Sequence, residues 1–470
     1  MTIKDFEIEQ EKLLADDEIR EAWTDYLSRF PYVSAYFRSA KQYENQISVV
    51  NGKKTGSDIN LYKLFTEQCF NLLNKNGYCG IVIPSAIYAS LGTMQLRKML
   101  FEKSRICNLI SLSNEKFIFE NVHHAFKFCF LSFKKGVNTN TFNAIFRIDP
   151  REAIPPKDLD SFFDNTEDFV KLSPELITKL SPDALSVMEF HGEIDRTIVD
   201  KMVKFPSLGE KLINTWGLKI GSEFHMTSDS YLFKSNPIKR SLPLYEGKMI
   251  NQFEHKTSVA KYFVDEKEGR QAIFGKRKDD YGEILPYQNY RLGFRAVAGN
   301  TNSRTIIVGP IPKNVFCGNS LLVSENLFGE DLILAQAILN SYIVDFYARQ
   351  MVTNNINMFY IYQLPVPRLK PNDKWYQPIV ERAARLICTT AEFAELWEEV
   401  MKSKWSEKVA ATQDYERGKL RAELDGIIAH IYSLTEEEFT YILSTFPIVP
   451  QPQKVAAQNA YRDVERGLIK

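Results

Sequence analysis

Residues 58–84 decide the fold class and read DINLYKLFTEQCFNLLNKNGYCGIVIP. Between Leu61 and Leu73 the apolar side chains recur at the spacing of one helix face. Gly77 follows as a residue suited to a left-handed helix cap. Residues 78–83 are a short apolar run that Pro84 closes, as is typical of a buried strand. A helix followed directly by such a strand predicts an α/β sheet.

The flanking segments continue this alternation and divide the chain. Residues 93–103 predict a helix, and residues 106–112 and 126–133 predict strands, so we expect residues 1–136 to form one α/β domain. Residues 137–205 have weak periodicity and predict an extension and linker. Residues 206–370 hold short β-like runs between turns and predict a mixed, β-rich domain. Residues 371–470 predict a helical C-terminal region.

Composition limits the classes of function. The 470 residues hold 59 Lys+Arg and 59 Asp+Glu, so a DNA-binding face would have to be a local basic patch. The six cysteines form no Cys-x-x-Cys pair, and no metal site is predicted. Neither a signal peptide nor an apolar stretch long enough to span a bilayer occurs, so we expect a cytoplasmic protein with no membrane partner.

Five stretches carry a resemblance to a known family. They are residues 58–84, 116–128, 244–253, 290–318 and 339–367. Together, and in this order, they resemble the N6-adenine DNA methyltransferases of the TaqI-like and type IIG restriction–modification class. The resemblance implies the distal part of a Rossmann-like methyltransferase sheet in residues 1–136. It also implies a target-recognition domain that binds double-stranded DNA in residues 206–370.

The chain departs from that family at the motifs for chemistry. The family binds S-adenosylmethionine with an Asp-x-x-x-Gly-x-Gly turn and positions adenine with Asn-Pro-Pro-Tyr, Phe or Trp. Neither occurs, and the one Asn-Pro pair, Asn236-Pro237, is followed by Ile238. We therefore expect no catalytic or cofactor-binding residue here. The cofactor would belong to the complete enzyme, with an N-terminal methyltransferase half or subunit as partner. Mg²⁺ would be needed only if an endonuclease domain exists elsewhere.

One aromatic residue is a candidate for base stacking. Methylation of an adenine amine requires the base to leave the duplex, and the family position that stacks on it corresponds to Phe119. The alternative is that Phe119 is core beside Phe117, Phe126 and Phe128. We expect His123 and His124 to be surface or internally satisfied histidines. Asp58 and Asn60 are interpreted as helix caps.

Cations and amide side chains inside the family-like stretches are the candidates for DNA contacts. Phosphate contacts give affinity and base-edge contacts give specificity. The candidates are Lys248, Arg291, Arg295, Asn302, Arg304, Asn319, Arg349, Asn354 and Gln363. The alternative for Arg295 and Arg349 is an internal ion pair. Gly217 and Gly221 either let the backbone approach DNA or serve a tight turn.

Three functional hypotheses follow. The first is the DNA-recognition and base-flipping part of a restriction–modification or phage-defence adenine methyltransferase, active with a second chain or a further N-terminal region. The second is a non-catalytic DNA-binding specificity protein. The third is a fragment of a longer enzyme.

Overall fold

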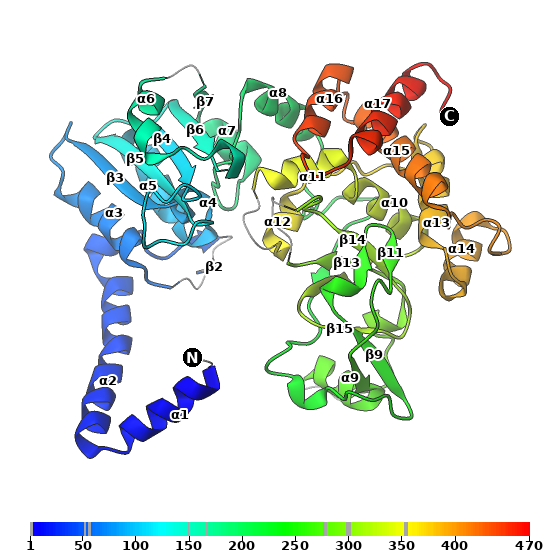
Figure 1. Cartoon of the computed structure of the whole chain (residues 1–470), viewed down its shortest axis with the longest axis horizontal. Coiled ribbons are helices and arrows are strands. Elements are labelled where there is room, and N and C mark those ends of the chain that lie inside the picture. Colours follow the sequence, from blue (N-terminus) through cyan, green and yellow to red (C-terminus); the bar gives the residue numbers. More distant parts are fainter. Residues whose placement is uncertain are drawn as a thin grey trace. The chain divides into compact units, whose positions relative to one another are not determined.

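The computed structural model describes residues 3–50, 53–54, 58–148, 150–165, 168–275, 280–297, 302–351 and 356–470. The chain folds into two compact units, Met1–Gly192 and Glu193–Lys470. Figure 1 labels their elements, and each unit is described by itself.

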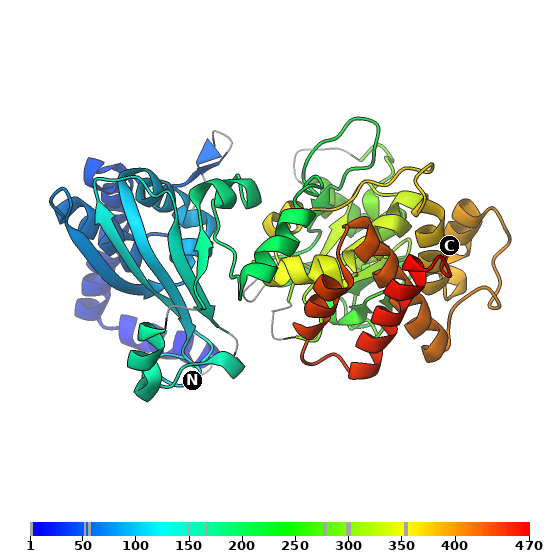
Figure 2. The same ribbon diagram turned by 90° about the horizontal axis from the view of Figure 1, so that it is seen from above.

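A five-stranded sheet forms the centre of the first unit (Figure 2). Its strands, in spatial order, are β3 (Tyr78–Pro84), β5 (Lys127–Lys135), β4 (Ser104–Ser113), β6 (Phe142–Arg147) and β7 (Val170–Leu172). The strand β5 runs antiparallel to β3 and β4, and β4 runs parallel to β6. The carboxyl ends of β3, β4 and β6 therefore lie at the same end of the sheet, where α/β folds place their ligand-binding loops.

Alternation along the strands gives this sheet two apolar faces. One is covered by α3 (Leu61–Leu72) and α5 (Met94–Lys103), and the rings of Phe70 and Phe133 lie 6.5 Å apart there. On the other face Ile110 and Phe128 form a buried cluster against which Phe163 of α6 (Leu159–Asp164) packs. The remaining elements are β1 (Val49–Val50), β2 (Lys53–Lys54), α4 (Ala86–Ala89) and α7 (Pro174–Leu180).

The first unit contains two N-terminal helices in which no side chain is buried over residues 6–14 and 17–39. They are α1 (Ile3–Leu14) and α2 (Asp17–Ser39), and α2 extends away from the sheet in Figure 1. Asp16 caps α2 by accepting from the backbone N–H groups of Glu18 and Ile19. Within the span Asp17–Ser39 no residue is buried. The apolar side chains of α2 therefore remain largely exposed, with ring contacts such as Trp23–Tyr26 and Tyr26–Phe30 along the helix itself.

The second unit combines small sheets with a helical C-terminal part. A four-stranded sheet has the order β14-β13-β16-β8, a three-stranded sheet has the order β12-β9-β15, and β10 pairs with β11. Their bounds are β8 (Ile220–Gly221), β9 (Ser241–Tyr245), β10 (Ile250–Asn251), β11 (Glu254–His255), β12 (Tyr262–Asp265), β13 (Arg291–Arg295), β14 (Val308–Ile311), β15 (Phe316–Cys317) and β16 (Leu321–Ser324).

Helices complete this unit. They are α8 (Glu193–Met202), α9 (Glu266–Phe274), α10 (Gly329–Leu339), α11 (Tyr342–Arg349), α12 (Met358–Gln363), α13 (Tyr376–Ile387), α14 (Ala394–Met401), α15 (Asp414–Ile431), α16 (Glu436–Ser444) and α17 (Gln451–Glu465). The helices α15 and α17 cross closely at Gly426, because a Cβ there would lie 2.8 Å from the carbonyl carbon of Ala460. Within the described ranges no helix has the length and apolarity needed to cross a membrane.

The predicted α/β class is confirmed, with a β-rich middle and a helical C-terminal region. The division into segments differs from the prediction. Residues 137–205 were expected to form an extension and linker, but β6 and β7 of this span belong to the central sheet. The strand β6 reads FNAIFR, and Ala144, Ile145 and Phe146 are all buried. A strand covered on both faces shows no alternation, which explains its weak periodicity.

Candidate nucleic-acid interface

The loop between β4 and β5 is organised by one buried amide side chain. The Asn114 Nδ2 donates to the carbonyl oxygens of Phe119 (2.9 Å) and Val122 (2.7 Å), and its Oδ1 accepts from the Phe119 N–H (2.9 Å). The Asn114 N–H donates to the Phe126 carbonyl oxygen. These bonds hold the loop that follows β4. They supply hydrogen-bond partners to backbone N–H and C=O groups of the loop, which the sheet does not pair.

Phe119 lies on the surface of this loop. Its side chain is 40% exposed, and its ring contacts Phe128 edge-to-face at 4.9 Å between centroids. Phe117 and Phe126 are also exposed, at 52% and 43%. Only Phe128 of this set is core. The alternative of a buried Phe119 is therefore wrong, while its role in base stacking stays a prediction.

The polar candidates of the first unit make local contacts. The ring of His124 lies 3.1 Å from Glu115, and Nδ1 of His123 accepts from the Ala125 N–H. Asn60 is the N-cap residue of α3, as the cap interpretation expects. Its side chain donates to the Asp58 carbonyl oxygen and, within the described residues, does not accept from a helix N–H, so it caps by position only.

Arg291 is a structural residue, which corrects its assignment to the DNA-binding set. It is 2% exposed, and its Nη1 donates to Glu223 at 2.6 Å. Its Nη2 donates to the Val315 carbonyl oxygen. The other Glu223 oxygen accepts from the Cys317 N–H, and burial raises the pKa of Glu223 while Arg291 opposes that rise. The pair joins β13 to the segment that follows β8 inside the fold.

Arg304 and Arg349 are also engaged internally, around the fully buried Asp345. The Arg304 Nε donates to Asp345 at 2.6 Å, and its guanidinium lies 4.1 Å from the Tyr342 ring centroid. The Arg349 guanidinium lies 4.1 Å from the Phe446 ring and donates to the carbonyl oxygens of residues 302, 303 and 445. The internal-pair alternative holds for Arg349, and both arginines leave the DNA-binding set.

Three other candidates are brought together at one end of the small sheets. The Gly247 N–H donates to the Ser320 hydroxyl at 3.0 Å, and a Cβ on Gly247 would lie 3.4 Å from Cγ of Arg295. This close approach places Lys248 and Asn319, the chain neighbours of Gly247 and Ser320, beside Arg295. We call residues 246–248, 295 and 319–320 the basic cluster.

The side chains of the basic cluster differ in how they are engaged. The Lys248 side chain is 57% exposed, and its ammonium pairs with Glu246 at 2.8 Å. The Asn319 Oδ1 accepts from the Met226 N–H, which leaves its amide N–H groups for another partner. Arg295 is half-buried, and no acceptor for its guanidinium lies among the described residues. Phosphate oxygens and base edges are the partners that such groups accept.

The remaining candidates lie apart from the basic cluster or outside the described residues. The Asn302 side chain is exposed, and its backbone oxygen accepts from Arg349. Both polar atoms of the Gln363 amide are buried, with no partner in the described part of the chain. Asn354 lies outside the described residues. A Cβ at Gly221 would collide with Glu325, whereas one at Gly217 would meet open space.

The first unit does not fit S-adenosylmethionine by itself. Glu189 is a buried acidic side chain of this unit, and its two oxygens accept from the Tyr88 hydroxyl (2.7 Å) and the Lys127 ammonium (3.0 Å). Gly77 and Gly136 lie at the other end of the strands, where β3 begins and β5 ends. No Gly-rich turn follows a strand in the described ranges. No cation-binding group of three acidic, His or Cys residues is found there either.

Sequence reasoning missed two organising groups. The Asn114 bracket is local, and an Asn directly after a strand could have indicated a turn. The Tyr88–Glu189–Lys127 cluster joins residues 101 positions apart, and no local pattern shows it.

Comparisons with known proteins give a family match over part of the chain and several similar solved structures. No curated protein matches the chain in sequence. Similar solved structures include the type IIG restriction endonuclease BpuSI (14% identity, 82% of this chain, 51% of that chain, TM-score 0.30). They also include the type IIL enzyme MmeI (13%, 83%, 52%, 0.45) and a nuclease-deletion mutant of the type ISP enzyme LlaGI (11%, 77%, 33%, 0.45).

This chain spans about half the length of the BpuSI and MmeI chains. The sequence match to a family is confined to the segment that includes α3, β3, α5, β4 and the stacking candidate Phe119. Residues 31–119 match the family model of the Eco57I restriction-modification methylase.

Proposed function

We propose that this chain is the DNA-recognition and base-flipping part of an S-adenosylmethionine-dependent N6-adenine DNA methyltransferase of a restriction–modification or phage-defence system. The donor-binding turn and the Asn-Pro-Pro-Tyr motif come from a second polypeptide segment, either further N-terminal in the same protein or in another chain. The basic cluster contacts double-stranded DNA. Phe119 stacks on the extruded adenine.

The free edge of the first sheet is the observation that carries the proposal. The strand β3 is the outermost strand, and among the described residues β5 is its one partner. The outer N–H and C=O groups of β3 are therefore available to another strand, and an open edge of this length invites pairing. Because β3 lies in the segment that matches the methylase family, the missing strands fit the donor-binding part of such an enzyme.

Exposed apolar side chains on α3, which packs beside β3, and on α2 support a protein partner. On α3, Leu61, Phe65 and Leu72 are 72%, 59% and 74% exposed. On α2, exposed apolar residues recur at the 4-3-4-3 spacing of a helix-packing stripe, namely Ile19, Trp23, Tyr26, Phe30 and Val33. Monomers rarely leave so many large apolar side chains in water, so these faces are typical of an interface.

The DNA-binding part of the proposal rests on available donors. Arg295, Lys248 and Asn319 combine two cations with an amide at one location, which suits phosphate contacts beside a base edge. Phe119 contributes an exposed ring held on a bracketed loop, and base–aromatic stacking is worth roughly 1–3 kcal/mol. The two sites belong to different units, and each is tested by its own variant.

The experiment begins with capture of the partner. The full chain serves as bait in native cells, and mass spectrometry identifies co-purifying polypeptides. The reconstituted pair is then assayed for transfer of labelled methyl groups from S-adenosylmethionine to adenine N6 in duplex DNA. We expect transfer by the pair and none by this chain alone. Transfer by this chain alone would refute the proposal. DNA binding without transfer by any reconstituted pair would leave the non-catalytic specificity protein.

An interface variant makes the test sharper. Changing Phe65→Glu together with Leu72→Lys alters two exposed side chains and should leave folding of the chain intact. We expect the pair to dissociate and methyl transfer to be lost. The matched control is Ile213→Glu, because Ile213 is 88% exposed and lies in the other unit. Equal activity of the α3 variant and the control would contradict the assigned surface.

A further inference from the structure

A cavity of about 1040 Å³ lies within the second unit, where α15 and α17 face the β10–β11 hairpin and the start of α11. Its origin is in small side chains. The helices α15 and α17 touch at Gly426 and Ala460. The lining residues include Gly418 and Ala422 on α15 and Ala456 on α17. Side chains this small cannot fill the space between neighbouring helices, so a hollow remains.

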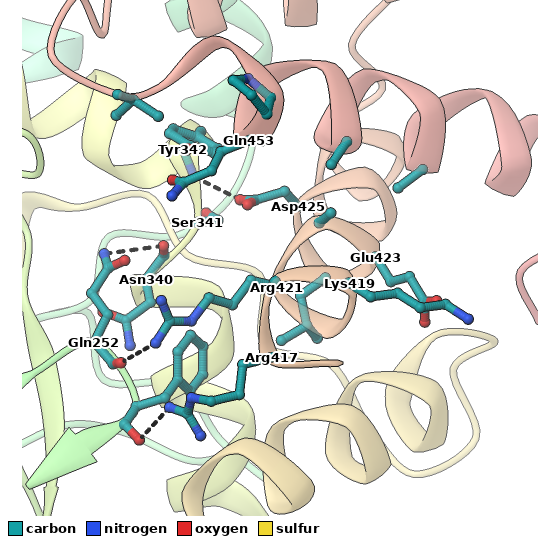
Figure 3. A pocket seen from close by; sticks show the side chains of 18 of the residues that line it. Gln252, Asn340, Ser341, Tyr342, Arg417, Lys419, Arg421, Glu423, Asp425 and Gln453 are labelled. Carbon is teal, nitrogen blue, oxygen red and sulfur yellow. Dashed lines mark hydrogen bonds and ion pairs between the residues drawn. The ribbon is translucent and has the colours of Figure 1, made fainter. Parts of the chain in front are cut away.

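Two arginines one helical turn apart enter this cavity from α15. Arg417 and Arg421 both donate to the same Glu254 oxygen, at 3.1 and 3.2 Å. Arg417 is otherwise engaged with the carbonyl oxygens of residues 253, 386 and 411. Figure 3 shows Arg421 extending from α15 toward Gln252, whose carbonyl oxygen accepts from its Nη2 at 3.0 Å.

Arg421 has donors left over. Its Nε–H is buried, and no acceptor for it lies within the described residues. A buried donor of a charged group costs free energy when it has no partner. Burial lowers the pKa of Arg421, and the neighbouring Arg417 and Arg304 lower it further while Glu254 opposes them. An acceptor carrying negative charge would remove both penalties at once.

The carboxylates around Arg421 do not balance the three arginines. Glu254 is shared by Arg417 and Arg421, and Asp345 is taken by Arg304. Asp425 lies one turn beyond Arg421 and accepts from the Tyr342 N–H at 2.8 Å. Burial raises the pKa of Asp425 to about 7, so near neutral pH it carries only part of a negative charge. Next to Arg421, three guanidinium groups therefore face two fully charged carboxylates. Farther along the lining, Lys419 is accompanied by Asp414, Glu423 and Asp463, so the anion-binding position is confined to the surroundings of Arg421.

Other lining residues would suit the organic part of a ligand. Tyr415 is 85% exposed at the beginning of α15 and lines the cavity. Gln453 and Asn459 of α17 are exposed and offer amide groups to the same space. An aromatic ring and amide side chains are the groups that hold nucleobases.

We propose that this cavity binds a small organic phosphate of nucleotide size, with the phosphate on Arg421 and the planar group near Tyr415. The site is separate from the basic cluster and from Phe119, and it does not depend on the proposed methyltransferase role. Ser303 and Arg304 form part of its wall, next to Asn302. An occupant would therefore stabilise the loop that carries Asn302.

The test is calorimetric titration of the full chain with inorganic phosphate, AMP, ATP and adenosine. We expect a nucleotide to bind and adenosine, which has no phosphate, to bind at least tenfold more weakly. A duplex DNA competitor separates a free nucleotide from backbone phosphate, and we expect no competition. Equal binding of AMP and adenosine, no binding of any phosphate, or displacement by duplex DNA would overturn the assignment.

Three variants assign binding to the cavity. Arg421→Ala should weaken nucleotide binding by about tenfold or more, since charge-assisted hydrogen bonds are lost. Ala456→Phe fills space while leaving the arginines in place and should also weaken binding. The control is Arg462→Ala, because Arg462 pairs with Glu436 outside the lining set. Circular dichroism verifies folding. Unchanged affinity in Ala456→Phe with a folded protein would refute the site.

Discussion

Arg291 and Arg295 lie on the same strand, β13. Substitution by Met should lower the stability of the protein at Arg291 and its affinity for DNA at Arg295. In Arg291→Met the Glu223 side chain, which is 10% exposed, loses its 2.6 Å ion pair. It keeps the Cys317 N–H as a donor. Removing one partner of a buried pair costs about 3–5 kcal/mol, because the remaining charge is uncompensated. We expect the free energy of unfolding to fall by that amount.

Arg295→Met removes a guanidinium that has no acceptor among the described residues. The free energy of unfolding should change by no more than about 0.5 kcal/mol. Affinity for duplex DNA should fall by about 1–3 kcal/mol if the side chain contacts a base edge, and the salt slope should fall by about 1 if it contacts phosphate. Stability and DNA affinity are thus expected to separate along one strand.

Two measurements test the pair. Urea unfolding followed by circular dichroism gives stability, and fluorescence anisotropy of labelled duplex DNA at several salt concentrations gives affinity. The double variant Arg291→Met/Glu223→Gln should recover part of the lost stability, because it removes the stranded charge. A stable Arg291→Met protein that no longer binds DNA would refute the assignment of Arg291 as a structural residue.

Three further outcomes are expected. Phe119→Ala should weaken binding to duplex DNA with a mismatched adenine by about tenfold and leave fully paired DNA unaffected; equal losses in anisotropy titrations would contradict stacking. Burial raises the pKa of Asp425 to about 7, above its unfolded value, so the native state holds this proton more tightly. The free energy of unfolding should therefore fall as pH rises from about 4 to 7, by up to about 4 kcal/mol, and Asp425→Asn should remove that part of the slope in urea titrations. Gly426→Ala should lower the melting temperature, at a cost of about 1–3 kcal/mol, because its Cβ meets the backbone of Ala460. Gly418→Ala in the same helix meets open space and should not lower it.

Periodicity made the first unit partly predictable. The helix Leu61–Leu72 and the strand Tyr78–Pro84 follow from apolar spacing and a closing Pro. The predicted left-handed cap at Gly77 is wrong, because α3 ends at Leu73 in extended backbone and the positive φ between helix and strand lies at Asn76. The strand Phe142–Arg147 could not be found this way, because apolar residues point to both of its faces. Local patterns show a half-buried strand, and a fully covered one is recognised only when its neighbours are known.

The role of a cation was harder to predict than the fold. Arg291 pairs with Glu223 across 68 positions, and Arg304 pairs with Asp345 across 41. Nothing in the residues around either arginine indicates its partner. For Phe119 the sequence left two outcomes open, and an exposed loop position was one of them. Its backbone is held by hydrogen bonds with the nearby Asn114 side chain, a local contact.

The arginines that became structural share one property. Arg291, Arg304 and Arg349 lie in stretches that resemble a family whose members recognise different DNA targets. A side chain that reads a target would have to change with it, since recognition is carried by variable loops on a common scaffold. A buried cation that holds strands together has no such freedom. A cation in a family-like stretch is therefore more readily a structural residue. The residues that select the DNA sequence should be sought among half-buried donors with no acceptor among the described residues, such as the guanidinium of Arg295 and the amide N–H groups of Asn319.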